Sequence, residues 1–226
     1  MKKISAFILV VFGTLAHAQP HQAETVSTYA ADNARLSIPQ TGRIVFMGDS
    51  IMELWKVLDS EMFSSNTNYI NRGISGQTTP QMLLRFREDV IELRPAVVVI
   101  LGGINDIAGN SGPIPLEDTF GNIVSMTEIA KTNNIRVILC SVLPARDIPW
   151  RSGQQPSDKV IRLNAMIKAY ASKHKLVYVD YFLKMRDKQN GLKEAYSEDG
   201  VHPNRNGYNV MKPLLQKAIH KTLKKN

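Results

Sequence analysis

The stretch that decides the fold is Ile44-Val45-Phe46-Met47-Gly48-Asp49-Ser50, an apolar run that ends in a glycine, a carboxylate and a hydroxyl. The run predicts a strand over 43–47, and its unbroken apolar character is typical of a parallel strand covered on both faces. A serine placed directly after such a strand has two interpretations. Ser50 either caps the helix that follows or acts as a nucleophile.

Four further apolar runs predict strands at 68–71, 96–101, 135–140 and 176–180. Amphipathic stretches with helical spacing separate these runs, so strands and helices alternate along the chain. The alternation predicts an α/β fold, a flavodoxin-like three-layer α/β/α sandwich around a five-stranded parallel sheet of order 2-1-3-4-5. In such folds, ligands bind beyond the carboxyl ends of the strands.

Local signals mark the ends of several helices. Thr79 followed by Pro80 predicts a helix that Thr79 caps and Pro80 opens. Glu117 and Asp118 suit the first turn of the stretch after 115, where the helix dipole favours negative charge. Pro213 interrupts the last helical pattern, so it either kinks that helix or starts it.

The beginning of the chain has the pattern of a secretory signal peptide. Lys2 and Lys3 precede an apolar stretch over 4–15, and Ala16-His17-Ala18 matches a cleavage site. The apolar stretch is too short to span a bilayer of roughly 30 Å, which disfavours the alternative of a membrane anchor. We therefore expect a signal peptide at 1–18, a single domain at 19–226, and export to the periplasm or the extracellular space.

Composition excludes several classes of protein. Cys140 is the only cysteine, so no internal disulfide can form and a small disulfide-stapled scaffold is excluded. The net charge of +8 includes a group of lysines near the end, which we interpret as a solvated helix face, with attraction to acidic polymers as the alternative. We expect no nucleic-acid partner and no membrane insertion after signal cleavage.

The residues that follow the strands carry the chemistry. They include Ser50, the turn 71–76 with Gly73, Asn105 and, before the last helix, Asp199 and His202. A serine hydroxyl needs a base, and histidine suits that role because its unperturbed pKa is near 6.5. A carboxylate three residues before the histidine can orient its ring within one tight turn.

Each of these residues also has a structural interpretation. Gly73 suits a turn, Asn105 an Asx turn, and Asp199 a turn that places a partly buried His202. Metal ligation by Asp199 and His202 is disfavoured because the other histidines do not cluster with them. If the set is catalytic, the amides of Ser50 and Gly73 and the side-chain amide of Asn105 form an oxyanion hole, and no cofactor or metal is needed.

These motifs together resemble the SGNH hydrolases, also called the GDSL-type esterase and lipase family. The resemblance assigns Ser50 as the nucleophile, Gly73 and Asn105 as oxyanion donors, and Asp199 and His202 as the rest of the catalytic triad. The motifs occur in the family's order over nearly all of the expected domain. The run 73–79 is similar to the branch of platelet-activating-factor acetylhydrolase subunits, which implies short acyl substrates.

One departure from the family pattern is the isoleucine at position 51, where the family has leucine. The serine does not lie in a Gly-x-Ser-x-Gly elbow, which disfavours an α/β-hydrolase. Asp49 and Asp106 are expected to brace loops. Trp150 and Arg146, after the fourth strand, either shape the cleft or serve packing and surface charge.

The sequence thus predicts an exported serine esterase that removes short acyl groups, acetyl in particular, from oxygen esters of carbohydrates or small molecules through an acyl-enzyme. The alternatives are a lysophospholipase or thioesterase of the same family, an acyltransferase that uses the same acyl-enzyme, and a non-catalytic glycan-binding protein on the same fold.

Overall fold

The structure, a computed structural model, describes residues 28–36, 42–151 and 153–224. The expected signal peptide at 1–18 lies outside these residues. The sheet has five parallel strands in the order β2-β1-β3-β4-β5, as the sequence predicts. The strands are β1 (Ile44–Gly48), β2 (Tyr69–Gly73), β3 (Val97–Leu101), β4 (Arg136–Cys140) and β5 (Val177–Val179).

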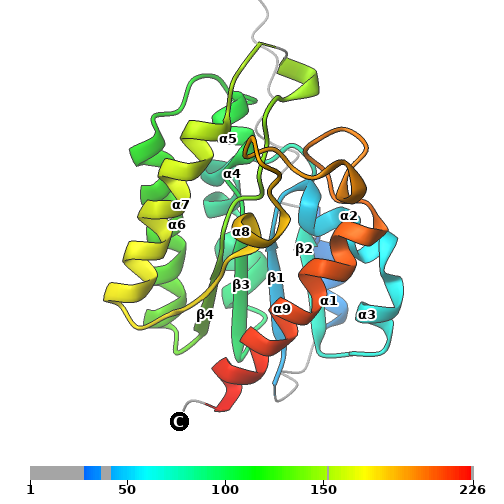
Figure 1. Ribbon diagram of the computed structural model, residues 1–226. Helices are drawn as coiled ribbons and strands as arrows, with labels where there is room; N and C mark the ends of the chain where they lie inside the picture. The colour runs from blue at the N-terminus through cyan, green and yellow to red at the C-terminus, as the bar shows by residue number, and fades with distance from the viewer. Residues whose placement is uncertain (1–27, 37–41, 152, 225–226) are drawn as a thin grey trace, which may run out of the picture.

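The helices cover both faces of the sheet. The connection from β1 to the edge strand β2, through α2 (Ser50–Leu58), moves in one direction across the sheet. The connection from β2 to β3, through α4 (Thr79–Leu84), moves in the opposite direction, past β1. Right-handed crossovers therefore place α2 and α4 on opposite faces. The last helix α9 (Arg205–Lys224) contacts α2 and lies in front of the sheet, whereas α6 (Leu116–Thr132) contacts both α4 and α7 (Ser157–Lys173) (Figure 1).

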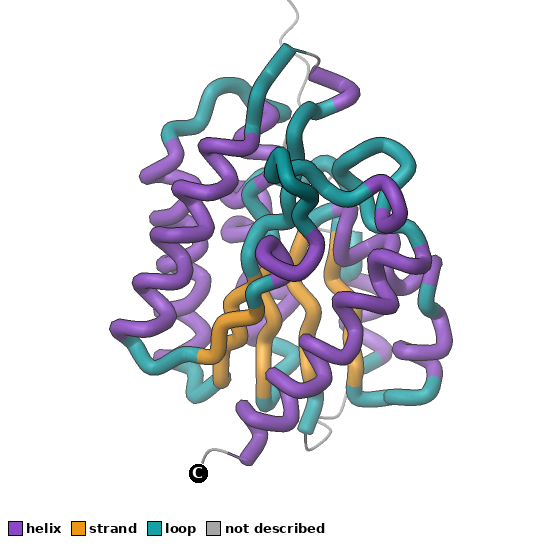
Figure 2. The backbone as a smooth tube through the Cα atoms, viewed as in Figure 1, coloured by secondary structure: helices purple, strands orange, loops and turns teal. Residues whose placement is uncertain are grey.

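Shorter elements lie mostly in the connections, and Figure 2 shows many of the loops gathered at the carboxyl ends of the strands. These elements are α1 (Ala30–Arg35), α3 (Ser60–Ser64), the π-helical turn η1 (Arg87–Ile91), α5 (Ile104–Ala108), the 3₁₀ turn η2 (Pro149–Arg151), α8 (Tyr181–Met185) and the 3₁₀ turn η3 (Glu194–Tyr196). Among the described residues, we find no helix with the length and apolar character that a membrane span requires.

One helix signal differs from the prediction, and one open alternative is decided. The residue that caps α4 is Thr78, which forms a capping box with Gln81, so Thr79 and Pro80 are the first two helical residues. This frees the Thr79 side chain to donate to the Asp106 carboxylate. Pro213 lies inside α9, so of the two alternatives for this proline a helix start is wrong.

Arg85, at the end of α4, joins the loops at the carboxyl ends of the strands through buried hydrogen bonds. Its guanidinium donates to Gln77 Oε1 at 2.6 Å, to Gly48 O at 3.0 Å and to Asp89 Oδ2 at 2.8 Å. The side chains of Arg85 and Asp89 are 1% and 4% exposed. Removing one partner of such a buried pair leaves a desolvated charge without compensation.

We predict that Arg85→Ala lowers the free energy of unfolding by about 3–5 kcal/mol, because Asp89 loses its buried cation. The matched control is Arg162→Ala, which breaks the exposed 3.5 Å pair with Glu117. It should cost less than about 1 kcal/mol, since solvent screens such pairs. Urea denaturation of both variants measures the difference. Equal losses would contradict the role given to the buried pair.

Candidate active site

Ser50 lies at the first turn of α2, directly beyond the end of β1. Asp49 is the cap of this helix, because its Oδ1 accepts the Ile51 amide at 3.0 Å. The Ser50 hydroxyl is therefore not needed for capping. It lies 2.9 Å from His202 Nε2. The contact favours the second interpretation of Ser50, a hydroxyl placed against a base.

Asp199 and His202 form a tight turn before α9. Asp199 Oδ1 accepts the backbone amides of Val201 at 2.9 Å and of His202 at 2.8 Å, and Oδ2 lies 2.6 Å from His202 Nδ1. Because a carboxylate only accepts hydrogen bonds, it assigns the ring proton to Nδ1 and leaves Nε2 free to accept from Ser50. The three side chains thus form a hydroxyl–imidazole–carboxylate relay.

The electrostatics of Asp199 suit a permanently ionised carboxylate. Partial burial acts to raise the pKa of Asp199, but hydrogen bonds from the His202 ring and from the His202 and Val201 amides outweigh it. The net pKa lies below the ordinary value. A charged Asp199 stabilises positive charge on the neighbouring imidazole ring.

Asn105 is held in a fixed orientation at the start of α5. Its Nδ2 donates to Gln77 O at 3.0 Å, and its Oδ1 accepts from Asn110 Nδ2 at 2.8 Å. The side chain is almost fully buried. An amide nitrogen has two hydrogens, so one N–H of Asn105 remains to donate to a bound molecule.

Gly73 does not serve as the sequence predicts. Its amide donates to Asn71 Oδ1 at 2.8 Å, on its own strand, so it is not available to an oxyanion. A Cβ at this position would lie 2.2 Å from the Glu53 amide nitrogen. The missing side chain therefore allows α2 to pack closely on β2, and the expected donor role of Gly73 is wrong.

Gly76, three residues further along the same turn, is not among the site residues that the motifs predict. Gly76 is exposed, has a φ of +77°, and has open space where a Cβ would be. Its carbonyl accepts from Asn110 Nδ2 at 3.4 Å, and its amide has no acceptor among the described residues. The signal was present in the sequence as the second glycine of Gly73-Ile74-Ser75-Gly76.

Asp49 and Asp106 make the bracing contacts expected of them. Asp106 accepts from the Thr79 amide at 2.9 Å and from its hydroxyl, which joins α5 to α4. Asp49 is fully buried, and its Oδ2 has no hydrogen-bond partner among the described residues. Burial, opposed by the bond from the Ile51 amide, raises the pKa of Asp49 to about 7.

Trp150, on η2, covers one side of the site. Its ring centroid lies 5.6 Å from that of His202, at an interplanar angle of 31°. The side chain is 40% exposed, so it forms a wall that a ligand can reach. Arg146 is exposed and makes no recorded contact with the triad among the described residues. The contacts of Trp150 therefore favour its role in shaping the site, and the role of Arg146 stays a prediction.

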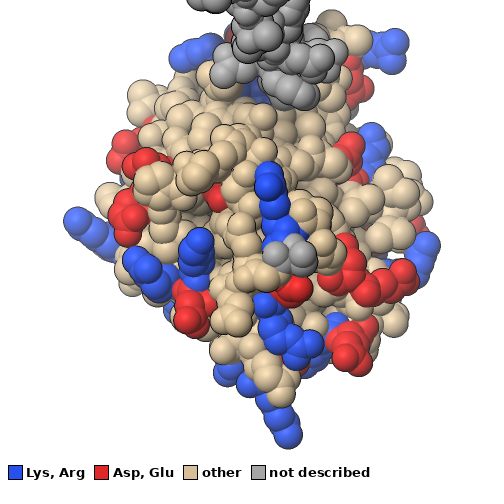
Figure 3. Space-filling view, turned by 90° about the horizontal axis from the view of Figure 1, so that it is seen from above, with Lys and Arg blue, Asp and Glu red and all other residues tan. Residues whose placement is uncertain are grey.

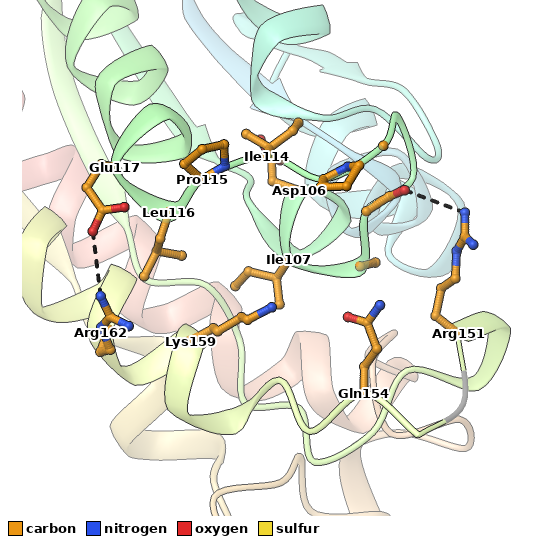
Figure 4. A pocket seen from close by; sticks show the side chains of 14 residues that line it. Asp106, Ile107, Ile114, Pro115, Leu116, Glu117, Arg151, Gln154, Lys159 and Arg162 are labelled. Carbon is orange, nitrogen blue, oxygen red and sulfur yellow. Dashed lines mark hydrogen bonds and ion pairs between the residues drawn. The ribbon is translucent and has the colours of Figure 1, made fainter.

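Two cavities flank these residues. One of about 540 Å³ is lined by Asp199 and His202 together with residues of α2 and the turn before α9. The other, of about 570 Å³, lies between α5, α6, α7 and η2, where Arg162 pairs with Glu117 and the Lys159 side chain extends toward Ile107 (Figure 4). It includes Asp106 but no member of the triad.

The surface around the site has mixed charge. Viewed over the carboxyl ends of the strands, Lys and Arg side chains are interspersed with Asp and Glu around the edge (Figure 3). This distribution favours a solvated surface over a single basic patch. Within the described ranges, no three His, Cys, Asp or Glu side chains gather closely enough to hold a metal ion.

Comparison with known families agrees with this geometry. The sequence model of the GDSL-like Lipase/Acylhydrolase family matches residues 46–210, most of the chain. The chain belongs to this family. The resemblance seen in the motifs is confirmed, and the protein is a hydrolase of the GDSL, or SGNH, family.

Individual relatives agree with the assignment. A crystal structure of a GDSL-like lipase from Bacteroides thetaiotaomicron is 49% identical, with a TM-score of 0.83 over 85% of this chain and 96% of that one. Esterase TesA of Pseudomonas aeruginosa is 29% identical over 65% of this chain and 70% of its own length. The acetyl xylan esterase AlAXEase shares the fold, with 21% identity and a TM-score of 0.64 over 78% of this chain and 98% of that one.

The buried Asp49 of this GDSL-family hydrolase makes stability depend on pH. Its native pKa of about 7 exceeds the unfolded value of about 3.9, so the native state binds the proton more tightly. The contribution of Asp49 to the free energy of unfolding therefore falls as pH rises from about 4 to about 7.

We predict that Asp49→Asn removes this contribution, because asparagine keeps an acceptor for the Ile51 amide and does not titrate. Measured by urea denaturation, the variant should gain stability relative to the wild type as pH rises from 4 to 7. Asp118→Asn, at an exposed position, controls for the loss of one carboxylate. Parallel stability curves for wild type and Asp49→Asn would contradict the assignment.

Proposed function

We propose that the protein is an exported serine esterase that removes short acyl groups, acetyl in particular, from the oxygen esters of carbohydrates. The observation that carries the proposal is the relay of Ser50, His202 and Asp199, with contacts of 2.9 and 2.6 Å. The family supplies the reaction class, an acylhydrolase. The acyl group, the alcohol and the acyl-enzyme are the proposed parts.

In the proposed first half-reaction, His202 Nε2 takes the proton of Ser50 as Oγ attacks the ester carbonyl carbon. The carbonyl π electrons move to oxygen and give a tetrahedral oxyanion. When that intermediate collapses, the bond to the alcohol oxygen breaks, and His202 gives its proton to the leaving alcohol. Asp199 stabilises the imidazolium between these two transfers.

The second half-reaction repeats the first with water. His202 takes a proton from water, the hydroxide attacks the acyl-enzyme, and Ser50 leaves with the proton that His202 returns. The products are the free acid and the regenerated serine. If another alcohol takes the place of water, the same steps transfer the acyl group to that alcohol. Acyl transfer is therefore the alternative reaction to measure beside hydrolysis.

The proposed oxyanion hole combines the amides of Ser50 and Gly76 with the free N–H of Asn105. The Ser50 amide, in the first turn of α2, has no acceptor among the described residues. Gly76 replaces Gly73 because the Gly73 amide is committed to Asn71. The bond from Asn110 Nδ2 to both Gly76 O and Asn105 Oδ1 places the Gly76 turn beside Asn105.

The surroundings of His202 favour a short acyl group and a polar alcohol. The cavity beside it is lined mostly by polar residues, with Leu54, Leu58 and Pro203 as its apolar members. The exposed indole of Trp150 offers a flat face of the kind that sugar rings contact. The acetyl xylan esterase on the same fold provides a precedent for a carbohydrate ester.

The proposal of export rests on the first 18 residues, with their two lysines, apolar stretch and Ala-His-Ala site. Residues 19–226 then form a single hydrolase domain. An exported enzyme meets polymeric glycans outside the cytoplasm, which agrees with a carbohydrate substrate. Mass spectrometry of the protein recovered after expression in a host with a secretory pathway identifies the mature N-terminus.

We predict that Ser50→Ala lowers kcat for p-nitrophenyl acetate by at least about 10³-fold and abolishes covalent labelling by a fluorophosphonate, because the hydroxyl bonded to His202 is lost. Ser125→Ala, which removes a hydroxyl bonded within α6, should leave both signals unchanged. A folded wild-type protein without turnover or labelling would instead indicate the non-catalytic glycan-binding alternative.

We also predict that kcat/KM does not rise from acetyl to octanoyl esters of the same alcohol, because the mostly polar lining beside His202 gives the added methylenes, each worth about 0.8 kcal/mol when buried, little apolar surface to bury against. A series of p-nitrophenyl esters measures this. Acetylated xylan and acetylated pectin then test the alcohol. Faster turnover of long acyl chains would favour the lysophospholipase or thioesterase alternative.

A further inference from the structure

Asn110 connects three parts of the site that lie far apart in the sequence. It follows the left-handed Gly109 at the end of α5. Its Nδ2 lies 2.8 Å from Asn105 Oδ1 and 3.4 Å from Gly76 O, and its Oδ1 accepts the indole N–H of Trp150 at 2.9 Å. Every polar atom of the Asn110 side chain therefore has a partner.

The partners at the two ends of this network fix how both amides point. An indole nitrogen can only donate, so the oxygen of Asn110 must face Trp150 and its nitrogen must face Asn105. Asn105 then presents its oxygen to Asn110. The Gln77 carbonyl, which can only accept, holds one hydrogen of the Asn105 nitrogen at the other end. These two bonds fix the direction in which the second hydrogen of the Asn105 nitrogen points.

The side chain at the outer end of the network also contacts the base. Trp150 lies over one face of the His202 ring, at a centroid distance of 5.6 Å. The same indole thus covers His202 with its ring and orients Asn110 with its N–H. Donor and base are coupled through one residue, Asn110, that neither the motifs nor the triad includes.

We propose that Asn110 is a positioning residue, which sets the amide orientation of Asn105 and links it to the Trp150 wall over His202. The inference rests on the proposed esterase function, in which Asn105 donates to the oxyanion. The Asn110 side chain bonds to Asn105, Gly76 and Trp150, and among the described residues it has no hydrogen bond to Ser50 or His202. Its effect appears in kcat, since an oxyanion donor acts on the transition state more than on the bound ester.

The informative variant is Asn110→Asp. The new carboxylate still accepts from Trp150, but its second oxygen meets Asn105 Oδ1, and two acceptors repel. The repulsion displaces the Asn105 amide from the orientation that its bonds to Asn110 and Gln77 O set. At low pH the protonated carboxyl regains an O–H donor, which restores the bond to Asn105. The kcat ratio of variant to wild type should therefore rise as pH falls.

We expect Asn110→Asp to reduce kcat about 10²-fold at pH 8, the effect of losing one oxyanion donor, with KM changed less than about 3-fold. Between pH 8 and pH 5, the kcat ratio to wild type should recover at least about 5-fold. The wild-type enzyme, measured over the same pH range, is the reference for that ratio. Asn110→Ala should lose about 10-fold at every pH, since it removes the bond without repulsion.

Trp150→Phe separates the two contacts of the indole, because phenylalanine keeps a ring over His202 and lacks the N–H. We expect a kcat loss of about 3-fold or more with little change in KM. Asn133→Asp, at an exposed position at the end of α6, introduces the same charge away from the site and should leave kcat unchanged. Thermal unfolding of each variant checks that it is folded.

Three results would overturn the proposal. One is kcat within 2-fold of wild type for Asn110→Asp and Asn110→Ala while Ser50→Ala is inactive, which leaves the esterase function intact. Another is a kcat ratio for Asn110→Asp that does not vary with pH. The third is a loss confined to KM. Activity retained by Ser50→Ala would instead overturn the proposed function itself.

Discussion

The site depends on three neighbouring parallel strands, β2, β1 and β3, that end at the same level. Gly48, the last residue of β1, pairs with Gly73 of β2 on one side and with Leu101 of β3 on the other. The segments that leave these strands must therefore begin at one edge of the sheet. Ser50, the turn with Gly76 and Asn105 all follow within four residues. A slip in register would displace each donor from the nucleophile.

The strands could be predicted because each depends on a short stretch of sequence, and their order could be predicted because the strands alternate with helices. Each is an apolar run long enough for a strand buried on both faces, and the connections obey the right-handed rule. Helix starts were less certain. Thr78 and Thr79 are adjacent capping residues, and the choice between them depends on whether Gln81 can reach back, as it does. Such a choice is decided by geometry rather than composition.

The glycine proposed as an oxyanion donor could not be assigned from the sequence, because both glycines of the turn fit a close approach of the backbone. The Asn71 side chain decides between them, since it accepts the Gly73 amide and itself donates to Met52 O in α2. Gly73 is therefore required by the close packing of α2 on β2, whereas Gly76 borders open space. The contacts of Asn110 with Trp150 were equally hidden, because they join residues forty positions apart.

The interpretations of Asp199 as a turn former and as a catalytic carboxylate prove to describe one arrangement. One oxygen closes the turn through two backbone amides while the other orients the ring of His202, so the bonds that shape the loop also fix the base. This turn leads directly into α9. Tyr208 of that helix stacks on Trp55 at 5.2 Å and donates to Ile51 O at 2.7 Å. Because α2 carries Ser50 and α9 follows His202, this buried contact ties together the two helices that position the proposed nucleophile and the proposed base.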